Sequence, residues 1–407
     1  MNDLLKKLQS MGLKIEKGSD IHPEAENKIP IDKVVQGEWL ESRGEKIYIT
    51  RNEYPFGSSH GKVLFKNELR FKNFSQFWRI KNLDTYNLQD FLFIDTETSR
   101  LSLGIGSIVF LFGGCYFTEK GLEVIQYFLD DPSNEAWFLA TIEDLLLNYK
   151  CLVSYNGKSF DIPMLRSRMV LNRMPYGNLN KDHLDLLHFA RMMWKLRLES
   201  RRLSDIEKEI MDFQRTEEEV PGWLVPQLYQ DYLGLGDATP LKGVFYHNEK
   251  DIVSLAALFV HINKMISDQE TLDSSNSLDI ISIGSIYQKS GNLSLSEEFY
   301  KLGLDKGLPE GIDYRILKNF AGVMKKQNKW PDAIKLWEMA ADMNDHDSCI
   351  EIAKYYEHHT KDIYQALVWV EAAIKIVNRT PDTANLLDRL GYRKRRLESK
   401  INSTYEK

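Results

Sequence analysis

The sequence contains few cysteines. Cys115, Cys151 and Cys349 lie far apart in a chain of 407 residues and form no CxxC pair. Disulfide-stabilised secreted folds and zinc ribbons both depend on closely spaced cysteines. The sequence therefore excludes both classes and predicts buried, unreactive thiols.

The sequence also lacks a long hydrophobic run. The longest apolar stretch, residues 105–116, is interrupted by glycines and a serine, and a membrane-spanning helix needs roughly 20 apolar residues. The N-terminal segment MNDLLKKLQSMGLK has no apolar signal-peptide core. We therefore expect a cytoplasmic protein that has no membrane partner.

An excess of positive charge is absent as well, because the formal net charge is −6. This value argues against indiscriminate coating of nucleic acids, which depends on clustered Lys and Arg, but it leaves room for a local basic groove. Residues 195–202 (KLRLESRR) carry four positive charges against one negative charge. Lys195, Arg197, Arg201 and Arg202 are candidate phosphate contacts. The alternative for this run is a solvated helix face.

The length of the chain and the change in its pattern of apolar and polar residues predict several domains, since one domain usually has roughly 100 to 200 residues. Residues 1–88 form an N-terminal region of unknown role. Residues 89–267 read as an α/β domain, and residues 278–400 as paired helices that follow the polar connector 268–277.

The α/β domain is predicted from apolar runs. FLFID at 91–95 is typical of a buried strand that ends in a carboxylate. Strands at 107–117 and 122–129, a helix at 134–147 and a strand at 151–157 follow, which gives the order βββαβα. Residues 159–261, including HLDLLHFARMMWKLRL, are expected to be mainly helical.

A repeat is visible in the C-terminal part. Ser296, Ala333 and Ala366 align at spacings of 37 and 33 residues, close to the tetratricopeptide period of about 34. These small residues let paired helices approach closely. A generic helical bundle is the alternative.

Asp95 and Glu97 form the triplet Asp-Thr-Glu at the end of an apolar run. Residues two apart on a strand project to the same face, so the two carboxylates point together. Adjacent like charges favour a divalent cation, and oxygen ligands suit Mg²⁺ or Mn²⁺ better than Zn²⁺. Taken alone, the triplet is equally consistent with solvated or capping acids.

Two further acids follow in order. Asp161 comes after Asn156-Gly157 and Phe160, where a strand turns into a helix. Asp251 lies on a later amphipathic helix with His247 four residues earlier, one helical turn away on the same face. Taken alone, Asp161 is also explained as a helix N-terminal residue that interacts with the helix dipole.

The ordered set strand-DTE, strand-N-G-x-x-F-D-helix and H-x-x-x-D resembles the DEDD exonucleases of the ribonuclease H-like superfamily. Over residues 90–262 it is most similar to the bacterial YprB-type ribonuclease H-like proteins, including their inserted segment DLLHFARMMWKLRLESRRLSDIE and their C-terminal helical repeats. The resemblance implies an α/β ribonuclease H-like domain, in which helices flank a mixed central sheet, followed by an all-α repeat domain.

The resemblance also implies a metal-dependent nuclease, a 3′-to-5′ exonuclease that acts on DNA or RNA with two Mg²⁺ or Mn²⁺ ions. Asp95 would bridge both ions, Glu97 and Asp251 would complete the first site, and Asp161 would hold the second. Asn156 and Phe160 are candidate substrate-side residues. The repeats would bind a protein partner.

One departure concerns the residue that activates water. In the family a histidine lies five positions before the last Asp, or a tyrosine four positions before it; here His247 is at four and Tyr246 at five. His247 is preferred because it faces Asp251, and Tyr246 is the alternative.

Three alternatives stay open. The same metal site would serve a structure-specific endonuclease, and a non-catalytic scaffold would bind nucleic acid and work through its repeats. The H-x-D-x-x-H run at His183, Asp185 and His188 places its histidines five apart, which favours structural roles over a shared metal. Asp185 is also a candidate extra acid at the site.

Overall fold

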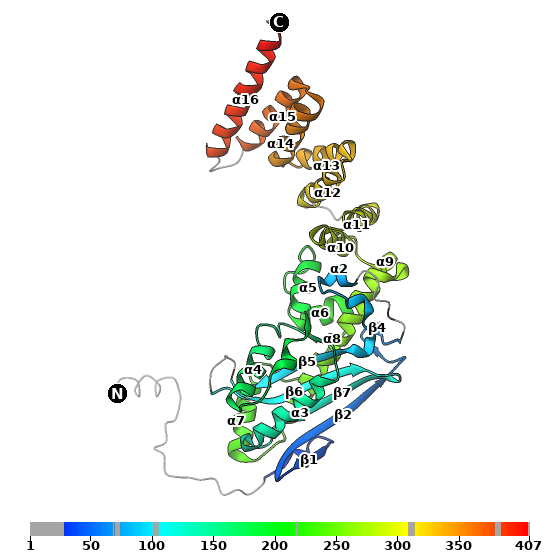
Figure 1. The fold of residues 1–407 in the computed structure, drawn as a ribbon, viewed down its shortest axis with the longest axis vertical. Helices are drawn as coiled ribbons and strands as arrows, with labels where there is room; N and C mark the ends of the chain where they lie inside the picture. The colour runs from blue at the N-terminus through cyan, green and yellow to red at the C-terminus, as the bar shows by residue number, and fades with distance from the viewer. Residues whose placement is uncertain are drawn as a thin grey trace, which may run out of the picture.

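The computed structural model describes residues 28–67, 69, 74–100, 106–216, 219–307, 314–378 and 384–405. In this part a sheet-containing domain continues into a column of helices toward the C-terminus (Figure 1). The N-terminal segment inspected above for a signal peptide lies outside the described residues. No described helix is long and apolar enough to cross a membrane.

A mixed sheet forms the centre of the domain, and its described strands run in the order β1-β2-β7-β6-β5-β8-β9. The strands are β1 (Glu38–Ser42), β2 (Glu45–Pro55), β5 (Phe91–Thr98), β6 (Val109–Phe117), β7 (Gly121–Phe128), β8 (Cys151–Ser154) and β9 (Asp182–Asp185). The predicted antiparallel meander of β5, β6 and β7 is confirmed, and β8 and β9 are added to it in parallel. A short separate hairpin consists of β3 (Ser59–His60) and β4 (Val63–Leu64).

The N-terminal part contributes strands to this sheet. β2 pairs antiparallel with β7 from Tyr48 opposite Phe128 to Pro55 opposite Gly121, and β1 pairs with β2 at the sheet edge. The sheet therefore continues across the boundary suggested at residue 88, and the division of the chain into domains stays a prediction.

One expectation about secondary structure is wrong. HLDLLHFARMMWKLRL was included in a mainly helical stretch, but residues 182–185 form β9, and helix α5 (Leu186–Met193) begins only after Asp185. The Asp185 carboxylate accepts a hydrogen bond from the backbone N–H of Leu187 and so caps the helix start. A short strand that runs directly into a capped helix is easily read as one apolar helix.

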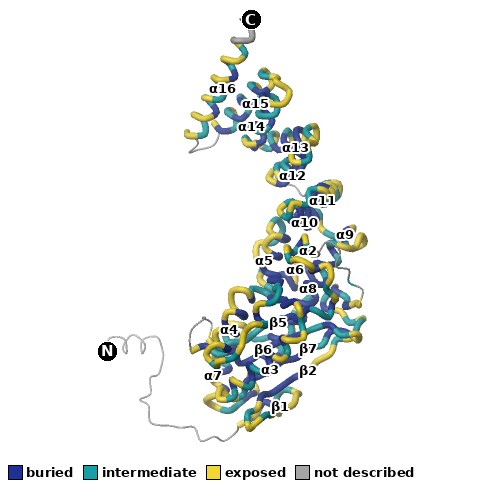
Figure 2. Tube along the Cα trace, in the orientation of Figure 1, coloured by how far each residue is buried: buried dark blue, intermediate teal, exposed yellow. Residues whose placement is uncertain are grey.

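The two faces of β5 bury different residues, because successive side chains alternate between faces. Phe91 and Phe93 pack in one core with α5, α6 (Leu203–Met211) and the middle of α8 (Leu241–Ser267). Leu92 and Ile94 pack in the other with α3 (Glu135–Leu147), α4 (Asp161–Leu171) and α7 (Val225–Leu235). Helices therefore cover both faces of the sheet, and its inner strands β6, β7 and β8 are buried, whereas β1 at the edge is largely exposed (Figure 2).

The described C-terminal region is helical, as predicted. It comprises α9 (Gln269–Ser274), α10 (Ser277–Ser290), α11 (Leu293–Asp305), α12 (Tyr314–Lys326), α13 (Trp330–Asp342), α14 (His346–Tyr355), α15 (Ile363–Val377) and α16 (Ala384–Tyr405), with a π-turn at Tyr356–Thr360. Ser296, Ala333 and Ala366 are fully buried. Ser296 Oγ donates to the carbonyl of Gly284 at 2.8 Å, so α11 lies close against α10.

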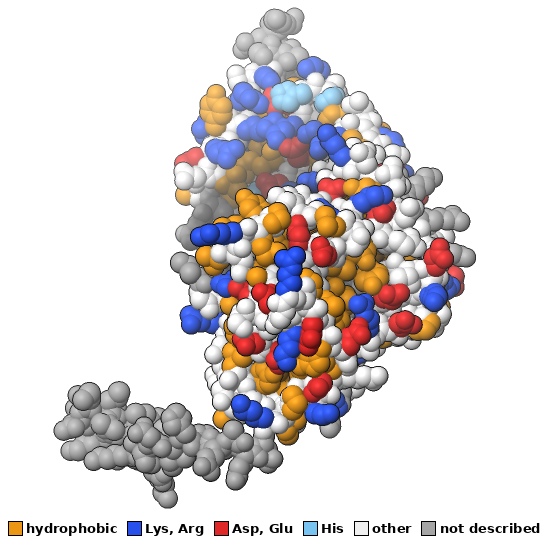
Figure 3. All heavy atoms as spheres, turned by 60° about the horizontal axis from the view of Figure 1, so that its bottom comes forward, with side chains coloured by type: hydrophobic (Ala, Val, Ile, Leu, Met, Phe, Trp, Pro, Cys, Tyr) orange, Lys and Arg blue, Asp and Glu red, His pale blue; other side chains and the backbone are white. Residues whose placement is uncertain are grey.

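The helical region is attached to the sheet domain through α10. Arg197 forms an ion pair with Asp279 of α10 at 2.6 Å, and Asn292, which follows α10 and caps α11, donates from Nδ2 to Gln76 Oε1 in helix α2 (Phe74–Trp78) at 2.7 Å. Lys and Arg side chains gather on the helices near the C-terminus, whereas acidic and basic side chains are interspersed over the nearer sheet domain (Figure 3). The three cysteines, Cys115, Cys151 and Cys349, are buried free thiols, as predicted.

Candidate active site

Asp95 and Glu97 continue the face of β5 that begins with Phe91 and Phe93, the face covered by α8. Helix α8 supplies a polar neighbour to each acid. Asn248 Nδ2 donates to Asp95 Oδ2 at 2.9 Å, and His247 Nε2 lies 3.8 Å from Glu97 Oε1.

Asp161 reaches the same place from the other side of β5. It is the first residue of α4, it is 7% exposed, and its Oδ1 accepts a hydrogen bond from Thr96 Oγ1 at 2.6 Å. Thr96 lies between Asp95 and Glu97 and points toward the opposite face, where α4 packs. The Asp-Thr-Glu triplet therefore contributes all three of its side chains to the site.

The Asn-Gly pair before Asp161 is required by the turn between β8 and α4. Asn156 has a φ of 69°, in the left-handed region that Asn tolerates better than most residues. A Cβ at Gly157 would lie 2.3 Å from Ser154 Oγ and 2.9 Å from Asp161 Oδ2. Only glycine allows the turn to pass so close to the carboxylate of Asp161.

The third element is α8, on which His247 and Asp251 lie one turn apart. His247 Nε2 is 3.5 Å from Asp251 Oδ2. The structure thus brings Asp95, Glu97, Asp161 and Asp251 to one place from β5, α4 and α8, with His247 among them. This grouping was expected from the sequence.

A series of hydrogen bonds that was not predicted from the sequence holds the Asp95 carboxylate in place. Thr50 Oγ1 on β2 donates to Gln126 Oε1 at 2.9 Å, Gln126 Nε2 donates to Asn248 Oδ1 at 2.9 Å, and Asn248 donates to Asp95. Asn248 is fully buried, and a Cβ at Gly113 would lie 2.2 Å from its Oδ1. The position of Asn248, three residues before Asp251 on one helix face, is a signal that could have revealed it.

The carboxylates of the site repel one another. Burial, together with the charges of Asp251, Asp161 and Glu97, raises the pKa of Asp95 well above its usual value. Burial likewise raises the pKa of Glu97 to about 8 and that of Asp161 to about 6. Buried carboxylates of this kind are destabilised as anions unless a cation joins them.

His247 is the main titratable base of the site. Burial alone lowers its pKa, but the hydrogen bond to Glu219, at 2.6 Å, and the charges of Asp251 and Glu97 outweigh burial and raise the pKa to about 9. The imidazole is therefore protonated near pH 7 in the metal-free chain.

Arg215 is the second cation at the site, and the sequence reading did not identify it. Its guanidinium forms an ion pair with Asp251, a two-point ion pair with Glu207 and an ion pair with Glu219 at 2.7 Å. Glu207 is 2% exposed and holds Arg215 in place. The only sequence signal is a lone arginine before an acidic run, which is too common to be diagnostic.

The predicted ligands of the metal ions are Asp95, Glu97, Asp161 and Asp251. Among the described residues, no group of three or more His, Cys, Asp or Glu side chains is arranged to hold a metal ion. Arg215 and His247 provide the positive charge beside Asp251 and Glu97 instead. The chemistry of the donors nevertheless suits Mg²⁺ or Mn²⁺, because four carboxylates converge and the pKa values of three of them, Asp95, Glu97 and Asp161, are raised. Release of Asp251 from Arg215 would free one of these ligands.

Tyr246, the alternative to His247, is turned away from the acids. Its hydroxyl accepts a hydrogen bond from the backbone N–H of Thr216 at 3.0 Å, and Lys250 lies over its ring. The geometry therefore favours His247 as the residue that faces the acids.

The substrate-side candidates lie at different places. Phe160 is 50% exposed next to Asp161, and Asn156 forms the turn described above. Lys195 lines a cavity beside α10, and Arg202 is exposed at the start of α6. The guanidinium of Arg201 donates to two nearby backbone carbonyls, at Leu198 and Glu199.

The H-x-D-x-x-H run forms no shared metal site in the structure. His183 Nε2 is hydrogen-bonded to Ser154 Oγ at 2.7 Å, and burial lowers its pKa to about 4. The Asp185 carboxylate accepts from the backbone N–H groups of Asn156 and Lys158, and so holds the turn that leads to Asp161. Its role is to position that turn.

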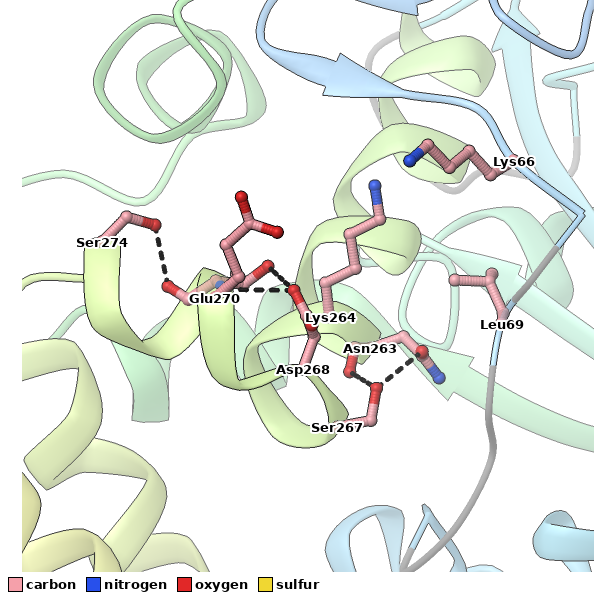
Figure 4. A pocket seen from close by; sticks show the side chains of 9 residues that line it. Lys66, Leu69, Asn263, Lys264, Ser267, Asp268, Glu270 and Ser274 are labelled. Carbon is pink, nitrogen blue, oxygen red and sulfur yellow. Dashed lines mark hydrogen bonds between the residues drawn. The ribbon is translucent and has the colours of Figure 1, made fainter.

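A cavity of about 650 Å³ lies elsewhere, at the C-terminal end of α8 (Figure 4). It is lined by Lys66, Lys264 and Asp268, among others. Lys264 follows Asp251 by 13 residues, or roughly 20 Å along a helix. This cavity is therefore separate from the acids.

Comparisons with known proteins agree with this geometry in part. The family model for the RNase H superfamily matches residues 92–263. The uncharacterized protein YprB from Bacillus subtilis (strain 168) is 30% identical over 341 residues, covering 81% of each chain. The solved family B DNA polymerase from the hyperthermophilic archaeon Pyrobaculum calidifontis is similar with a TM-score of 0.35 and 16% identity; the match covers 52% of this chain and only 29% of the polymerase.

Proposed function

This chain belongs to the same family as Bacillus subtilis YprB and contains a ribonuclease H-like domain, and from this premise we propose that it is a metal-dependent nuclease of the DEDD exonuclease type. The domain itself supports a role in nucleic-acid processing. The proposal adds the reaction: hydrolysis of phosphodiester bonds of DNA or RNA, in the 3′-to-5′ direction, with two Mg²⁺ or Mn²⁺ ions.

One observation carries the proposal. Four carboxylates from three separate elements converge, and burial together with mutual repulsion raises the pKa of Asp95 and Glu97. A chain gains no stability from such a cluster unless cations are added. Clusters of groups with strongly shifted pKa values are typical of functional sites.

Asp95, Glu97, Asp161 and Asp251 would hold the two ions. Bound there, the ions supply an activated water and stabilise the negative charge that develops on the phosphate oxygens. The chain positions the ligands through neighbours: Asn248 orients Asp95, and Thr96 orients Asp161. Such outer partners hold metal ligands in their required orientation.

His247 is the proposed water-activating residue. It can accept a proton only after losing its own, and its raised pKa comes from the negative charges of Glu219, Asp251 and Glu97. Cations bound to Glu97 and Asp251 offset part of that charge. The pKa of His247 would then fall toward the range in which imidazole acts as a base.

Two exposed aromatic side chains flank the acids and suit stacking on nucleobases. Phe160 precedes Asp161 directly, and Trp223 is 70% exposed next to Gly222, where an added Cβ would lie 3.8 Å from His247 Nε2. The C-terminal helices, if they act as tetratricopeptide-like repeats, would bind a protein partner. Their small-residue contacts at Ser296, Ala333 and Ala366 support that assignment.

The test uses end-labelled single- and double-stranded DNA and RNA, incubated with Mg²⁺ or Mn²⁺ and the full chain. A bound catalytic metal contributes several kcal/mol, and about 1.4 kcal/mol corresponds to a tenfold rate change. We therefore expect Asp95→Asn to slow the cleavage on the order of 1,000-fold. Asp144→Asn, an exposed acid on α3, is the matched control and should cleave normally.

The products distinguish the alternatives. Stepwise shortening from the 3′ end that disappears in Asp95→Asn supports the exonuclease. Discrete internal cuts would assign an endonuclease to the same acids. Binding of nucleic acid without cleavage under any metal condition would leave a non-catalytic scaffold and would overturn the proposal.

A further inference from the structure

Two cavities lie side by side where the sheet domain meets the helical region. The first, of about 240 Å³, lies between α2, α5 and α10; the second, of about 220 Å³, lies between α5, α10 and α12. Both are lined by Met192 of α5 and Lys289 of α10, so the two cavities adjoin at the junction seen in Figure 1. We call the two together the junction groove.

The junction groove is strongly basic. Its walls hold one carboxylate, Asp185, and six Lys or Arg side chains, all exposed: Arg79, Lys158, Arg191, Lys195, Lys289 and Arg315. In the part of the chain that the structure describes, no ion pair is formed by Lys158, Arg191, Lys195 or Lys289. The positive charge of the groove is therefore not balanced by its own walls.

The single acid does not offset this charge toward solvent. Asp185 is 4% exposed, and its carboxylate accepts hydrogen bonds from the backbone N–H groups of Asn156, Lys158 and Leu187. It is occupied with holding the turn between β8 and α4.

One end of the groove lies against the turn that leads to Asp161. Lys158 and Asp185 line its first cavity, and the Asp185 carboxylate accepts hydrogen bonds from the backbone of that turn at Asn156 and Lys158. The exposed Phe160 follows in the same turn, directly before Asp161. A ligand in the first cavity therefore contacts the turn that positions one of the acids from which cleavage is proposed.

We propose that the junction groove binds the backbone of a single-stranded nucleic acid and carries it from the acidic site along α5 onto α10 and α12. Lys158, Arg191, Lys195 and Lys289, which form no ion pair among the described residues, suit phosphates. The apolar side chains between them, such as Met192, Ile80 and Trp78, suit unpaired bases. This proposal rests on the proposed function, because the nuclease acids fix which end of the groove holds the end of the nucleic acid.

The experiment measures binding of a fluorescein-labelled 20-nucleotide single strand by fluorescence anisotropy in EDTA, with the full chain and without cleavage. The variant Arg191→Glu/Lys195→Glu/Lys289→Glu reverses three groove charges. Because each phosphate contact to a single strand adds about 0.7 to the slope of log K against log salt, the slope should become shallower by about 2. The affinity at low salt should fall at least about tenfold.

The matched control is Lys120→Glu/Lys335→Glu/Lys375→Glu, which reverses three exposed charges outside the groove. If both variants lose the same affinity, the groove assignment is wrong. The groove assignment is also wrong if the groove variant loses binding to a duplex but still binds the single strand. It is equally wrong if the variant still binds both nucleic acids and loses binding to a protein partner instead.

The failure of this proposal can be distinguished from that of the proposed function. A four-nucleotide substrate is too short to fill the groove, so its cleavage by the unchanged chain with Mn²⁺ tests the nuclease apart from the groove. Strand binding through the groove without cleavage of any substrate would overturn only the nuclease. Normal cleavage of both substrates by the groove variant would overturn only the groove.

Discussion

Two buried carboxylate sites in this chain have opposite electrostatics. Glu357, after α14, has no exposed side-chain surface, and it accepts hydrogen bonds from Arg393, Arg396 and Lys400 of α16. Burial alone raises its pKa, but these cations outweigh burial and lower it. At Asp95, burial and the neighbouring acids act in the same direction and raise the pKa.

The difference separates a structural acid from a candidate functional one. Glu357 is balanced by cations of its own chain and joins α16 to the preceding helices. At the sheet-domain site, Arg215 and His247 together face Glu97, Asp251 and Glu219, while Asp95 and Asp161 receive only neutral hydrogen-bond donors. Such a site is completed by added positive charge.

The largest stability effect is expected for Arg215→Met. This change leaves Glu207, 2% exposed, without its two-point partner. Loss of one partner of a buried ion pair typically costs about 3 to 5 kcal/mol. The loss in the free energy of unfolding is measured by urea unfolding in EDTA. Arg51→Met, which breaks a pair with Glu38 that is largely exposed on both sides, should cost less than about 1 kcal/mol; equal losses would contradict the role of Arg215.

The second effect tests the comparison directly, through neutral substitutions at both acids. Glu357→Gln should destabilise the fold by about 1 to 3 kcal/mol, because three cations lose their charged acceptor. Asp95→Asn should leave stability unchanged or raise it, since it removes a repelled charge. Both are measured by urea unfolding at pH 8 in EDTA. Destabilisation by Asp95→Asn equal to that by Glu357→Gln would remove the distinction between the sites.

A smaller effect is expected for Asn248→Ala, which removes the donor to Asp95. Loss of an outer partner of a metal ligand typically costs about 10- to 100-fold in metal affinity or activity. Titration with Mn²⁺, followed by calorimetry, measures the affinity independently of cleavage. Asn178→Ala removes a comparable amide-to-carboxylate hydrogen bond, to Glu143, far from the acids and should not change Mn²⁺ binding.

A further effect concerns the pH dependence of the melting temperature in EDTA. Folded-state pKa values of about 8 for Glu97 and about 6 for Asp161 exceed the unfolded values, so folding weakens as the pH rises from about 4 toward 8. The raised pKa of His247, about 9, gives stability that is complete below about 6.5 and lost as the pH rises through 9. The melting temperature should therefore decrease as the pH rises from 5 to 9, and saturating Mn²⁺ should make this decrease smaller. A flat profile without metal would contradict the raised pKa values.

Much of this site could be predicted from sequence because its signals are local. Alternation along β5 puts Asp95 and Glu97 on one face, and helical spacing puts His247 beside Asp251. Apolar runs also predicted the meander and the paired helices. These features depend only on the periods of strands and helices.

The remaining features depend on contacts between distant segments. Arg215 joins the site through Glu207 and Asp251, and Thr50 reaches Asp95 only because β2 pairs with β7. No local period reports such pairings. β9 was missed for a related reason: its strand character comes from pairing with β8, and its apolar residues continue into α5 without a break.

The pairing of β2 with β7 has a practical consequence for anyone who shortens this protein. A fragment cut to the family-matched residues 92–263 would keep all four acids but lose β2, and so would expose the edge of β7. A bare strand edge invites other chains to pair with it. The fragment would also lack Thr50, and Asn52 and Tyr54, which bind Glu249 of α8. A minimal expression fragment should therefore begin before Glu38, and inactivity of a shorter one would report on its missing strands rather than on its acids.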